Sequence, residues 1–419
     1  MTRGTAVIRC WTAGILLALG GAAPAVHAQE RPAEIQPEAQ GFLREPDPVH
    51  RAALFGSRHF SNGEMTNGWY IDNSSMIPGA GWISLGPGYR SWYNKDSLFV
   101  DASASISWRA YQLAQARVEL PKLARSRLAV GSHFKWQDAK QVGTFGEGPD
   151  TLESDRAQYG LRTTNLVGYA TLRPVRWLGI GTQVGWLKPS VDAAGGWFRT
   201  NRPDARDRFP ADPVFARADQ PTFVHTEASV TADTRDVPGH PTSGGLIRAA
   251  AARYSDRDGD AFTFRRYEAE AAGFVPLSGG RVVVALRGWM VGSDTADGQV
   301  VPFYLQPSLG GHNTLRGYAD YRFHDRNLLV VNAEARIAMM THVDAAVFVD
   351  AGNVAARAAD LNLNKRSYGA GLRLHGPRAT FARLDIARGG EGWRIMFKLN
   401  DPLSLARLTR RTTPAPFVP

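Results

Sequence analysis

The chain has 419 residues, a formal net charge of +10 at pH 7 and a single cysteine, Cys10. Hydrophobic residues make up 43% of it, but after the N-terminal segment no apolar run reaches the roughly 18 residues of a helical membrane span. One cysteine excludes a disulfide framework and cysteine-rich zinc sites. A positive balance can indicate nucleic-acid binding, but the export signal described next argues against such a partner.

Residues 1–28 have the pattern of a secretory signal peptide. Two arginines near the start precede an apolar stretch, and small residues at 26–28 suit a cleavage site. The apolar centre, 13–19, is shorter than the ~20 residues of a spanning helix, so a membrane anchor is the less favoured alternative. Residues 29–60 are polar and punctuated by prolines, and we expect an extended lead-in there.

From 61 to 400 the sequence alternates apolar and polar residues in segments of strand length. In 98–108 every second residue is apolar, whereas the intervening residues are mainly serine and aspartate. The segments 327–341 and 343–351 repeat this pattern. A strand of about ten residues with one apolar face suits a membrane barrel, in which every second side chain meets lipid. We therefore expect a membrane barrel over 61–400, followed by a C-terminal tail at 401–419.

Counting these segments gives 15 or 16 strands, and bacterial barrels close with an even number. The sequence thus predicts an all-β fold, a transmembrane antiparallel β-barrel of about 16 strands, with Arg373, Asp385 and Lys398 pointing into the lumen. A water-soluble β-sandwich also shows alternation. Tryptophans near segment ends favour the barrel, because they suit an aromatic girdle at the membrane interfaces. They are Trp92, Trp108, Trp177, Trp186, Trp289 and Trp393.

One loop is unusual in its composition. It lies between strand patterns at 281–291 and 327–341, and from 310 to 318 it reads Gly-Gly-His-Asn-Thr-Leu-Arg-Gly-Tyr. Two glycines permit backbone conformations that other residues avoid, and a cation and an aromatic ring follow them. Its candidate functional residues are Gly310, Gly311, Leu315, Arg316, Gly317 and Tyr318.

A second string follows the strand pattern at 223–233 and reads Asp-x-Arg-Asp-x-Pro-x-x-Pro-x-x-Gly. Prolines fix the backbone and glycines permit tight bends, so we predict a rigid turn between two strands. Its marked residues are Asp233, Arg235, Asp236, Pro238, Pro241 and Gly244.

Both strings resemble motifs of the BamA/TamA-type surface-antigen superfamily, the outer-membrane protein-assembly barrels. The resemblance covers 233–399 well and 97–190 loosely. It implies that the loop folds into the barrel and that Arg316 contacts an acidic residue on the strand with the Phe-x-Asp-x-Gly pattern, here Asp350. The family's acidic residue on the preceding strand corresponds to Glu334.

The alternation by itself places Glu334 and Asp350 on the lumen faces of neighbouring strands. A barrel of this width can hold a loop, and the planar guanidinium of Arg316 can then pair with carboxylates. Such a pair can be a structural lock that fixes the loop, or it can take part in substrate handling. Catalysis by the two carboxylates is the least favoured reading, because a neighbouring arginine keeps both ionised, whereas a general acid needs a raised pKa.

Other enzyme signals are thin. The sequence has no nucleophile elbow, no His-Glu-x-x-His and no phosphate-binding glycine loop. Its ten histidines are scattered without metal-ligand spacing. The run Asp256, Asp258 and Asp260 fits an Asp-rich hairpin turn better than a calcium site. We therefore expect no catalytic residue, no cofactor, no nucleotide and no metal.

The resemblance implies a protein of the bacterial outer membrane that assists insertion or translocation of polypeptides, with membrane lipid and client polypeptides as partners. The stretch between residue 29 and the first strand is shorter than one of the family's periplasmic POTRA domains, so none is expected. A passive pore or structural surface protein that kept the fold remains an alternative. An outer-membrane esterase is a third, although no nucleophile constellation is visible.

Overall fold

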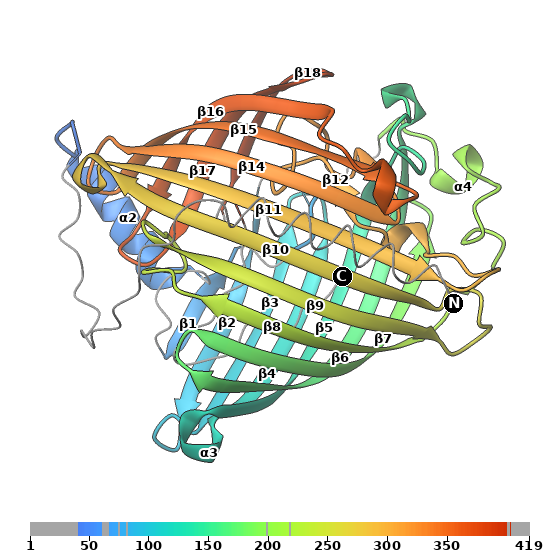
Figure 1. Ribbon diagram of the computed structural model, residues 1–419, viewed down its shortest axis with the longest axis horizontal. Coiled ribbons are helices and arrows are strands. Elements are labelled where there is room, and N and C mark those ends of the chain that lie inside the picture. Colours follow the sequence, from blue (N-terminus) through green and yellow to red (C-terminus); the bar gives the residue numbers. More distant parts are fainter. Residues whose placement is uncertain are drawn as a thin grey trace.

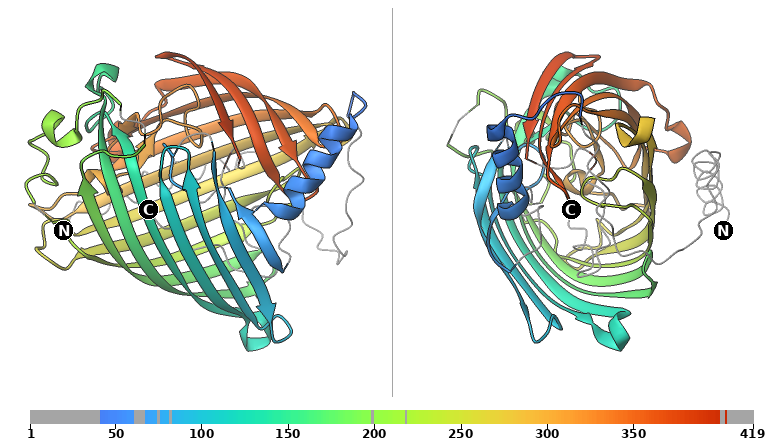
Figure 2. Two further views of the ribbon diagram at one scale, coloured as in Figure 1. Left: turned by 180° about the vertical axis from the view of Figure 1, so that it is seen from behind. Right: turned by 90° about the vertical axis from the view of Figure 1, so that its left-hand side faces the viewer.

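Sixteen strands form a single antiparallel sheet that curls into a barrel (Figures 1 and 2). The computed structural model describes residues 41–60, 67–73, 76–80, 83–197, 200–217, 219–399 and 403. The expected signal peptide, the start of the lead-in and nearly all of the C-terminal tail lie outside the described residues. The predicted fold class and strand number are confirmed.

The barrel strands follow one another around the sheet in sequence order, each antiparallel to the next. They are β1 (Gly68–Asp72), β2 (Ser84–Tyr93), β3 (Leu98–Ser107), β4 (Gln112–Lys122), β5 (Leu128–Thr144), β6 (Ala157–Val175), β7 (Leu178–Asp192), β8 (Phe223–Asp233), β9 (Gly244–Asp256), β10 (Phe264–Leu277), β11 (Val282–Thr295), β14 (Asn327–Ala338), β15 (Val343–Ala355), β16 (Lys365–His375), β17 (Thr380–Gly389) and β18 (Gly392–Lys398).

The remaining elements lie in the connections and before the first strand. Two short strands pair with each other between β11 and β14, namely β12 (Ser308–Leu309) and β13 (Phe323–His324). Among the described residues the helices are α2 (Asp47–His59), α3 (Leu123–Ser126) and α4 (Ala205–Arg208), with 3-10 turns η1 (Glu153–Asp155), η2 (Ser278–Gly280), η3 (Phe303–Leu305) and η4 (Ala358–Asp360). None of the helices in the described part of the chain is long and apolar enough to cross a membrane.

The barrel turns apolar side chains outward and charged ones inward. On β15, Val347 and Val349 are 52% and 55% exposed, whereas Asp350 is fully buried. A water-soluble sheet would bury the valines and expose the aspartate. The reversed pattern belongs to a barrel whose outer face meets lipid and whose polar face lines the lumen. It excludes the β-sandwich.

The aromatic girdle is present, but two of the six tryptophans expected in it point elsewhere. Four of them are exposed on the outer face or at its ends, namely Trp108, Trp177, Trp186 and Trp393. Trp92 is instead buried and packs on Phe99, with ring centroids 4.4 Å apart. Trp289 donates its Nε1 hydrogen to Glu268 at 2.9 Å. The position of a tryptophan near a strand end therefore did not decide which face it takes.

The two ends of the barrel differ in the length of their connections. One end has short turns such as 339–342 and 376–379, and the other has long loops such as 193–222 and 296–326. In bacterial barrels short turns face the periplasm and long loops face the exterior. We therefore assign the short-turn end, where α2 also lies, to the periplasmic side (Figure 1).

Helix α2 replaces part of the extended lead-in expected from the prolines. Asp47 stands in its first turn, and a proline occupies one of the first positions, where its missing backbone donor is not needed. Arg58 and His59 stand in the last turn, where cations favour the helix dipole. These end signals are compatible with a helix, although the proline content alone predicts an extended chain.

Packing against the barrel holds α2 in place. A Cβ on Gly56 would come within 2.5 Å of the ring of Phe381 on β17, so helix and strand are in close contact. Phe60, directly after the helix, pairs with Ile71 of β1 in an isolated bridge, and its ring lies 5.9 Å from that of Phe381. The helix thus contacts the barrel near both ends of the sheet, at β1 and at β16 (Figure 2).

Strands β1 and β18 are the two edges of the sheet. No backbone ladder joins them among the described residues, and they have five and seven residues, fewer than any other barrel strand. Asn73 donates its side-chain amide to the carbonyl of Leu399 at 3.1 Å, so the edges are in contact. We call this junction of β1 and β18 the seam.

Candidate functional site

The loop after β11 bends back at two glycines. Gly310 and Gly311 have φ angles of 111° and 87°, in the left-handed region that L side chains rarely adopt. A Cβ on Gly310 would also come within 2.3 Å of the carbonyl oxygen of Ala319. The backbone N–H of Gly311 donates to the carbonyl of Tyr318 at 3.1 Å, which closes residues 311–318 into a compact turn.

Arg316 extends from this turn to two carboxylates on the barrel wall. Its Nε and Nη2 donate to the two oxygens of Asp350 on β15 at 2.9 and 2.7 Å, and its Nη1 donates to Glu334 on β14 at 2.5 Å. The backbone N–H of Arg316 also donates to Asp350 at 3.1 Å. The guanidinium carbon lies 3.4 Å from the ring centroid of Phe348. Loop and wall residues expected from the sequence are thus brought together.

The ion pair is part of a larger buried network. Arg373 on β16 donates to Glu334 at 2.8 Å and to Asp385 on β17 at 2.5 Å. Arg383, also on β17, donates to Asp385 at 3.3 Å and to the carbonyl of His312 in the loop at 2.8 Å. With Arg316 and Asp350, the network has three arginines and three carboxylates, so the buried charges balance. Buried charges are stable only when paired in this way.

Arg383 was missed by the sequence analysis, which placed Arg373, Asp385 and Lys398 in the lumen without linking them. Arg383 precedes Asp385 by two residues, and both are fully or almost fully buried. Arg383 could have been placed in the lumen from its spacing to Asp385, because residues two apart on a strand lie on the same face. Its partner, the carbonyl of His312, is a backbone group and leaves no mark in the sequence.

Small residues let the loop approach the last hairpin. A Cβ on Gly317 would come within 2.5 Å of the backbone nitrogen of Gly389, so only glycine fits this contact. The hydroxyl of Tyr318 accepts the N–H of Gly390 at 3.1 Å. Leu315 is fully buried in an apolar cluster that includes Val330 of β14. The loop therefore rests on the β17–β18 hairpin, beside the seam.

The same loop also contacts the other side of the seam. Asp320 accepts the backbone N–H of Gly79, which lies in the connection between β1 and β2, at 3.0 Å. A cavity lies beside this contact, and its wall includes Arg109, Tyr318 and Trp393. The loop thus touches the chain on both sides of the seam from within the barrel.

The second motif forms the expected compact turn. The Nε and Nη2 of Arg235 each donate to an oxygen of Asp233 at 2.8 Å, and its Nη1 donates to the carbonyl of Pro238 at 3.3 Å. Asp236 accepts the backbone N–H of Val237 at 2.8 Å. These bonds fix the first half of the turn, at the short-turn end of the barrel.

The second half of this turn packs against the barrel wall. Gly244 has a φ of 85°, and a Cβ there would meet the carbonyl of Thr234 at 2.3 Å. The carbonyl of Pro241 accepts a hydrogen bond from Arg336 on β14. Arg336 is two residues from Glu334 and on the same face of β14, so one strand face contacts the turn and the loop. The two motifs do not contact each other directly through any hydrogen bond between the described residues.

The chemistry of the loop site is that of a fixed support. Asp350 accepts hydrogen bonds from Asn332 at 2.8 Å and Ser367 at 3.2 Å in addition to those from Arg316. Glu334 is shared by Arg316 and Arg373. Hydrogen bonds from guanidinium groups hold both carboxylates in fixed positions on the barrel wall. The arrangement can therefore anchor a loop.

The sequence and the fold of the chain are similar to those of known proteins. A model of the Omp85 superfamily domain matches residues 178–391, the range that holds both motifs. Among solved structures, the chain is similar to BamA from Haemophilus ducreyi lacking POTRA domains 1–3, with 15% identity and a TM-score of 0.58 over 80% of this chain and 69% of that one. It is also similar to CdiB from Escherichia coli, with 13% identity and a TM-score of 0.53. That match covers 80% of this chain and 63% of CdiB, less than two thirds of its length. No curated protein sequence matches the chain.

Proposed function

The chain belongs to the Omp85 superfamily and lies in the bacterial outer membrane, and from that premise we propose that it assists the insertion or translocation of other polypeptides there. Omp85 barrels handle client polypeptides and are not enzymes, so the chain is not an enzyme. Insertion leaves the client in the membrane, whereas translocation carries it across. The experiment below measures each of these two outcomes.

The observation that carries the proposal is the seam. Strands β1 and β18 are the shortest in the barrel, and no ladder joins them among the residues that the structure describes. An unpaired strand edge presents backbone N–H and C=O groups in a row. An extended client segment can add to such an edge as a further strand. We therefore assign the seam as the place where a client strand enters the barrel wall.

The inward loop supports this role from inside. Its Tyr318 and Asp320 contact opposite sides of the seam, while Arg316 fixes the loop to β14 and β15, away from the seam. A loop fastened to a rigid part of the wall can hold two weakly paired edges near each other without a ladder between them. We propose that this is the purpose of the lock: the loop keeps the seam closed but separable.

The test is to reconstitute the purified chain in lipid vesicles with and without a crosslink across the seam. In a Cys10→Ser background, Asn73→Cys and Leu399→Cys place thiols on the two contacting edges. A short bifunctional thiol reagent then joins them in the purified chain before it enters lipid vesicles. We expect the untreated chain to accelerate folding of an unfolded barrel protein into the vesicles, or to carry a secreted polypeptide into them, and the crosslinked chain to lose that activity.

A matched control fastens two strands that are already paired. Leu128 and Leu172 are register partners on β5 and β6, so crosslinked cysteines at these positions leave the seam free. This control must stay active. Steady ion conductance with neither client folding nor client import would instead indicate a passive pore. Activity that survives the seam crosslink would overturn the assignment of the seam as the client entrance.

A further inference from the structure

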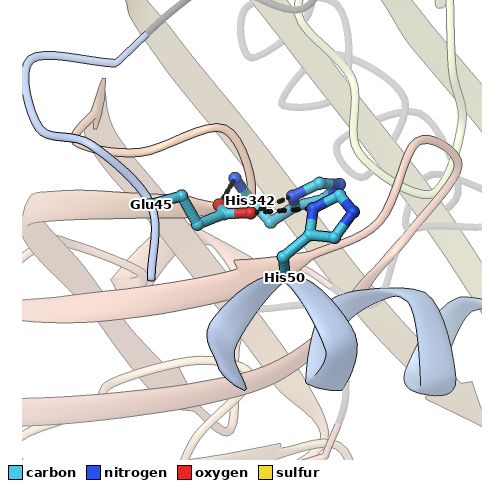
Figure 3. A group of neighbouring side chains, drawn as sticks. All are labelled: Glu45, His50 and His342. Atoms are coloured by element: carbon cyan, nitrogen blue, oxygen red, sulfur yellow. Dashed lines mark hydrogen bonds and ion pairs between the residues drawn. The ribbon is translucent and has the colours of Figure 1, made fainter. Parts of the chain in front are cut away.

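Three side chains with metal-ligand atoms converge at the short-turn end of the barrel. Glu45 precedes α2, His50 lies in its first turns, and His342 lies in the turn between β14 and β15 (Figure 3). Glu45 and His342 are 297 residues apart in the sequence. The separation explains why the histidines look scattered when the sequence alone is examined. The fold brings them together.

The geometry is that of a ligand set. Oε1 of Glu45 lies 3.1 Å from Nδ1 of His50 and 2.8 Å from Nδ1 of His342, and the ligand atoms of all three residues lie within 4.8 Å of one another. Ligand atoms about 2.0–2.1 Å from a tetrahedral zinc ion are about 3.3 Å from each other. Small movements of the side chains therefore make room for an ion among them.

The carboxylate is also held in place by a second contact. The backbone N–H of His342 donates to Oε2 of Glu45 at 2.7 Å, which leaves Oε1 directed at both imidazoles. Hydrogen bonds of this kind orient ligands in metal sites. The side chain of His50 is 51% exposed, so an ion can reach the set from solvent.

We propose that Glu45, His50 and His342 bind one divalent transition-metal ion, with zinc as the best match, and that this ion fastens α2 to the β14–β15 turn. Two imidazoles and one carboxylate are a ligand set that zinc favours, and three protein ligands leave a coordination position for water. Magnesium and calcium prefer sets made of oxygen atoms. Metal binding would thus join a segment next to β1 to the wall of the barrel.

A second set of ligand atoms lies close by but is less suitable. It consists of His240, Asp344 and His375, and the ring centroids of His342 and His375 are 6.2 Å apart. Here Nη1 of Arg336 lies 3.3 Å from Nδ1 of His240. The ring nitrogen of His240 that faces Asp344 is Nε2, at 3.4 Å, but a guanidinium beside the same ring places a positive charge there that repels a metal cation. We therefore assign the ion to the first set.

The test measures metal binding and the mobility of α2 in one protein. The full chain, purified in detergent without a histidine tag and stripped of metal by a chelator, is titrated with Zn²⁺, and with Co²⁺ as a spectroscopic probe. We expect one equivalent bound per chain, visible absorption of cobalt with nitrogen and oxygen ligands, and slower proteolysis of residues 41–60 in the presence of zinc.

Variants locate the site. His50→Ala should weaken zinc binding by more than the roughly 10- to 100-fold that loss of a supporting residue causes, and should remove the protection of 41–60. Glu45→Gln keeps the size of the side chain and should also weaken binding. His59→Ala changes an exposed histidine on the same helix and should bind zinc normally.

Other results of the same zinc titrations would overturn the proposal. Absence of stoichiometric zinc binding by the folded chain would end it, as would binding that is unaffected by His50→Ala. His375→Ala should leave binding intact. If it abolishes binding while His50→Ala does not, the ion belongs to the second set and does not fasten α2.

Discussion

Arg316 is the residue on which the site depends, because its planar side chain fits the two carboxylates and the aromatic ring on the barrel wall. The planar guanidinium donates to both oxygens of Asp350 and to Glu334 while its face lies over the ring of Phe348. A lysine ammonium cannot donate two parallel hydrogen bonds to one carboxylate or stack in the same way. The requirement is therefore for an arginine, and a positive charge alone would not meet it.

We predict that Arg316→Ala destabilises the folded barrel by about 3 kcal/mol or more, because breaking a buried ion pair leaves buried carboxylates without their counter-charge. The folded band in an unheated gel should disappear at a lower temperature, and residues 305–325 should become accessible to protease. Arg357→Ala is the matched control. Arg357 pairs with Asp360 on the surface with a 78% exposed side chain, so its removal should change neither measurement. Equal behaviour of the two variants would refute the lock.

The site was partly predictable at this scale. The resemblance of the 310–318 string to its family suggested the partners of Arg316, and alternation placed Asp350 and Glu334 on the lumen face. Neither could predict that Arg383 binds the carbonyl of His312. That contact depends on how far the loop descends into the barrel, which no local pattern encodes.

At the scale of elements, the sequence predicts the strands well but does not predict helix α2. Strands were predictable because the difference between lipid and lumen repeats every second residue. Helix α2 was not, because its prolines favour an extended chain and its stability comes from contact with Phe381, far along the sequence. The prediction thus failed for a segment whose conformation depends on tertiary packing more than on its local sequence pattern.

Replacement of Gly56 tests the packing of α2. Gly56→Val should raise helix propensity but drive the new side chain into the ring of Phe381, which a Cβ already approaches to 2.5 Å. We expect α2 to leave the barrel and residues 41–60 to be cleaved faster by protease. Ala52→Val places the same side chain on the exposed face of the helix and should remain protected. If Gly56→Val is protected to the same degree, α2 is not held by this contact.

At the scale of the whole molecule, the distribution of polarity decides which solvent the barrel is built for. The lumen contains the buried network of Arg316, Arg373 and Arg383 with three carboxylates, and a loop is folded against it. The outer face has valine, leucine and isoleucine exposed along many strands. In water such a surface would drive aggregation, whereas in a bilayer it is the favourable state. The same sequence therefore requires a membrane to hold its fold.

A charge placed on the outer face tests this requirement. Val349 lies at the middle of β15 with its side chain 55% exposed, so Val349→Arg should place a guanidinium near the centre of the hydrocarbon layer. Arginine there costs about 2–4 kcal/mol on the lipid face of a barrel. We expect a lower yield of folded barrel in lipid vesicles and a lower urea concentration at the unfolding midpoint. Val300→Arg, at a 39% exposed position in the loop after β11, should behave as wild type because it stays in water. If Val349→Arg folds as well as this control, the face that carries Val349 does not contact lipid.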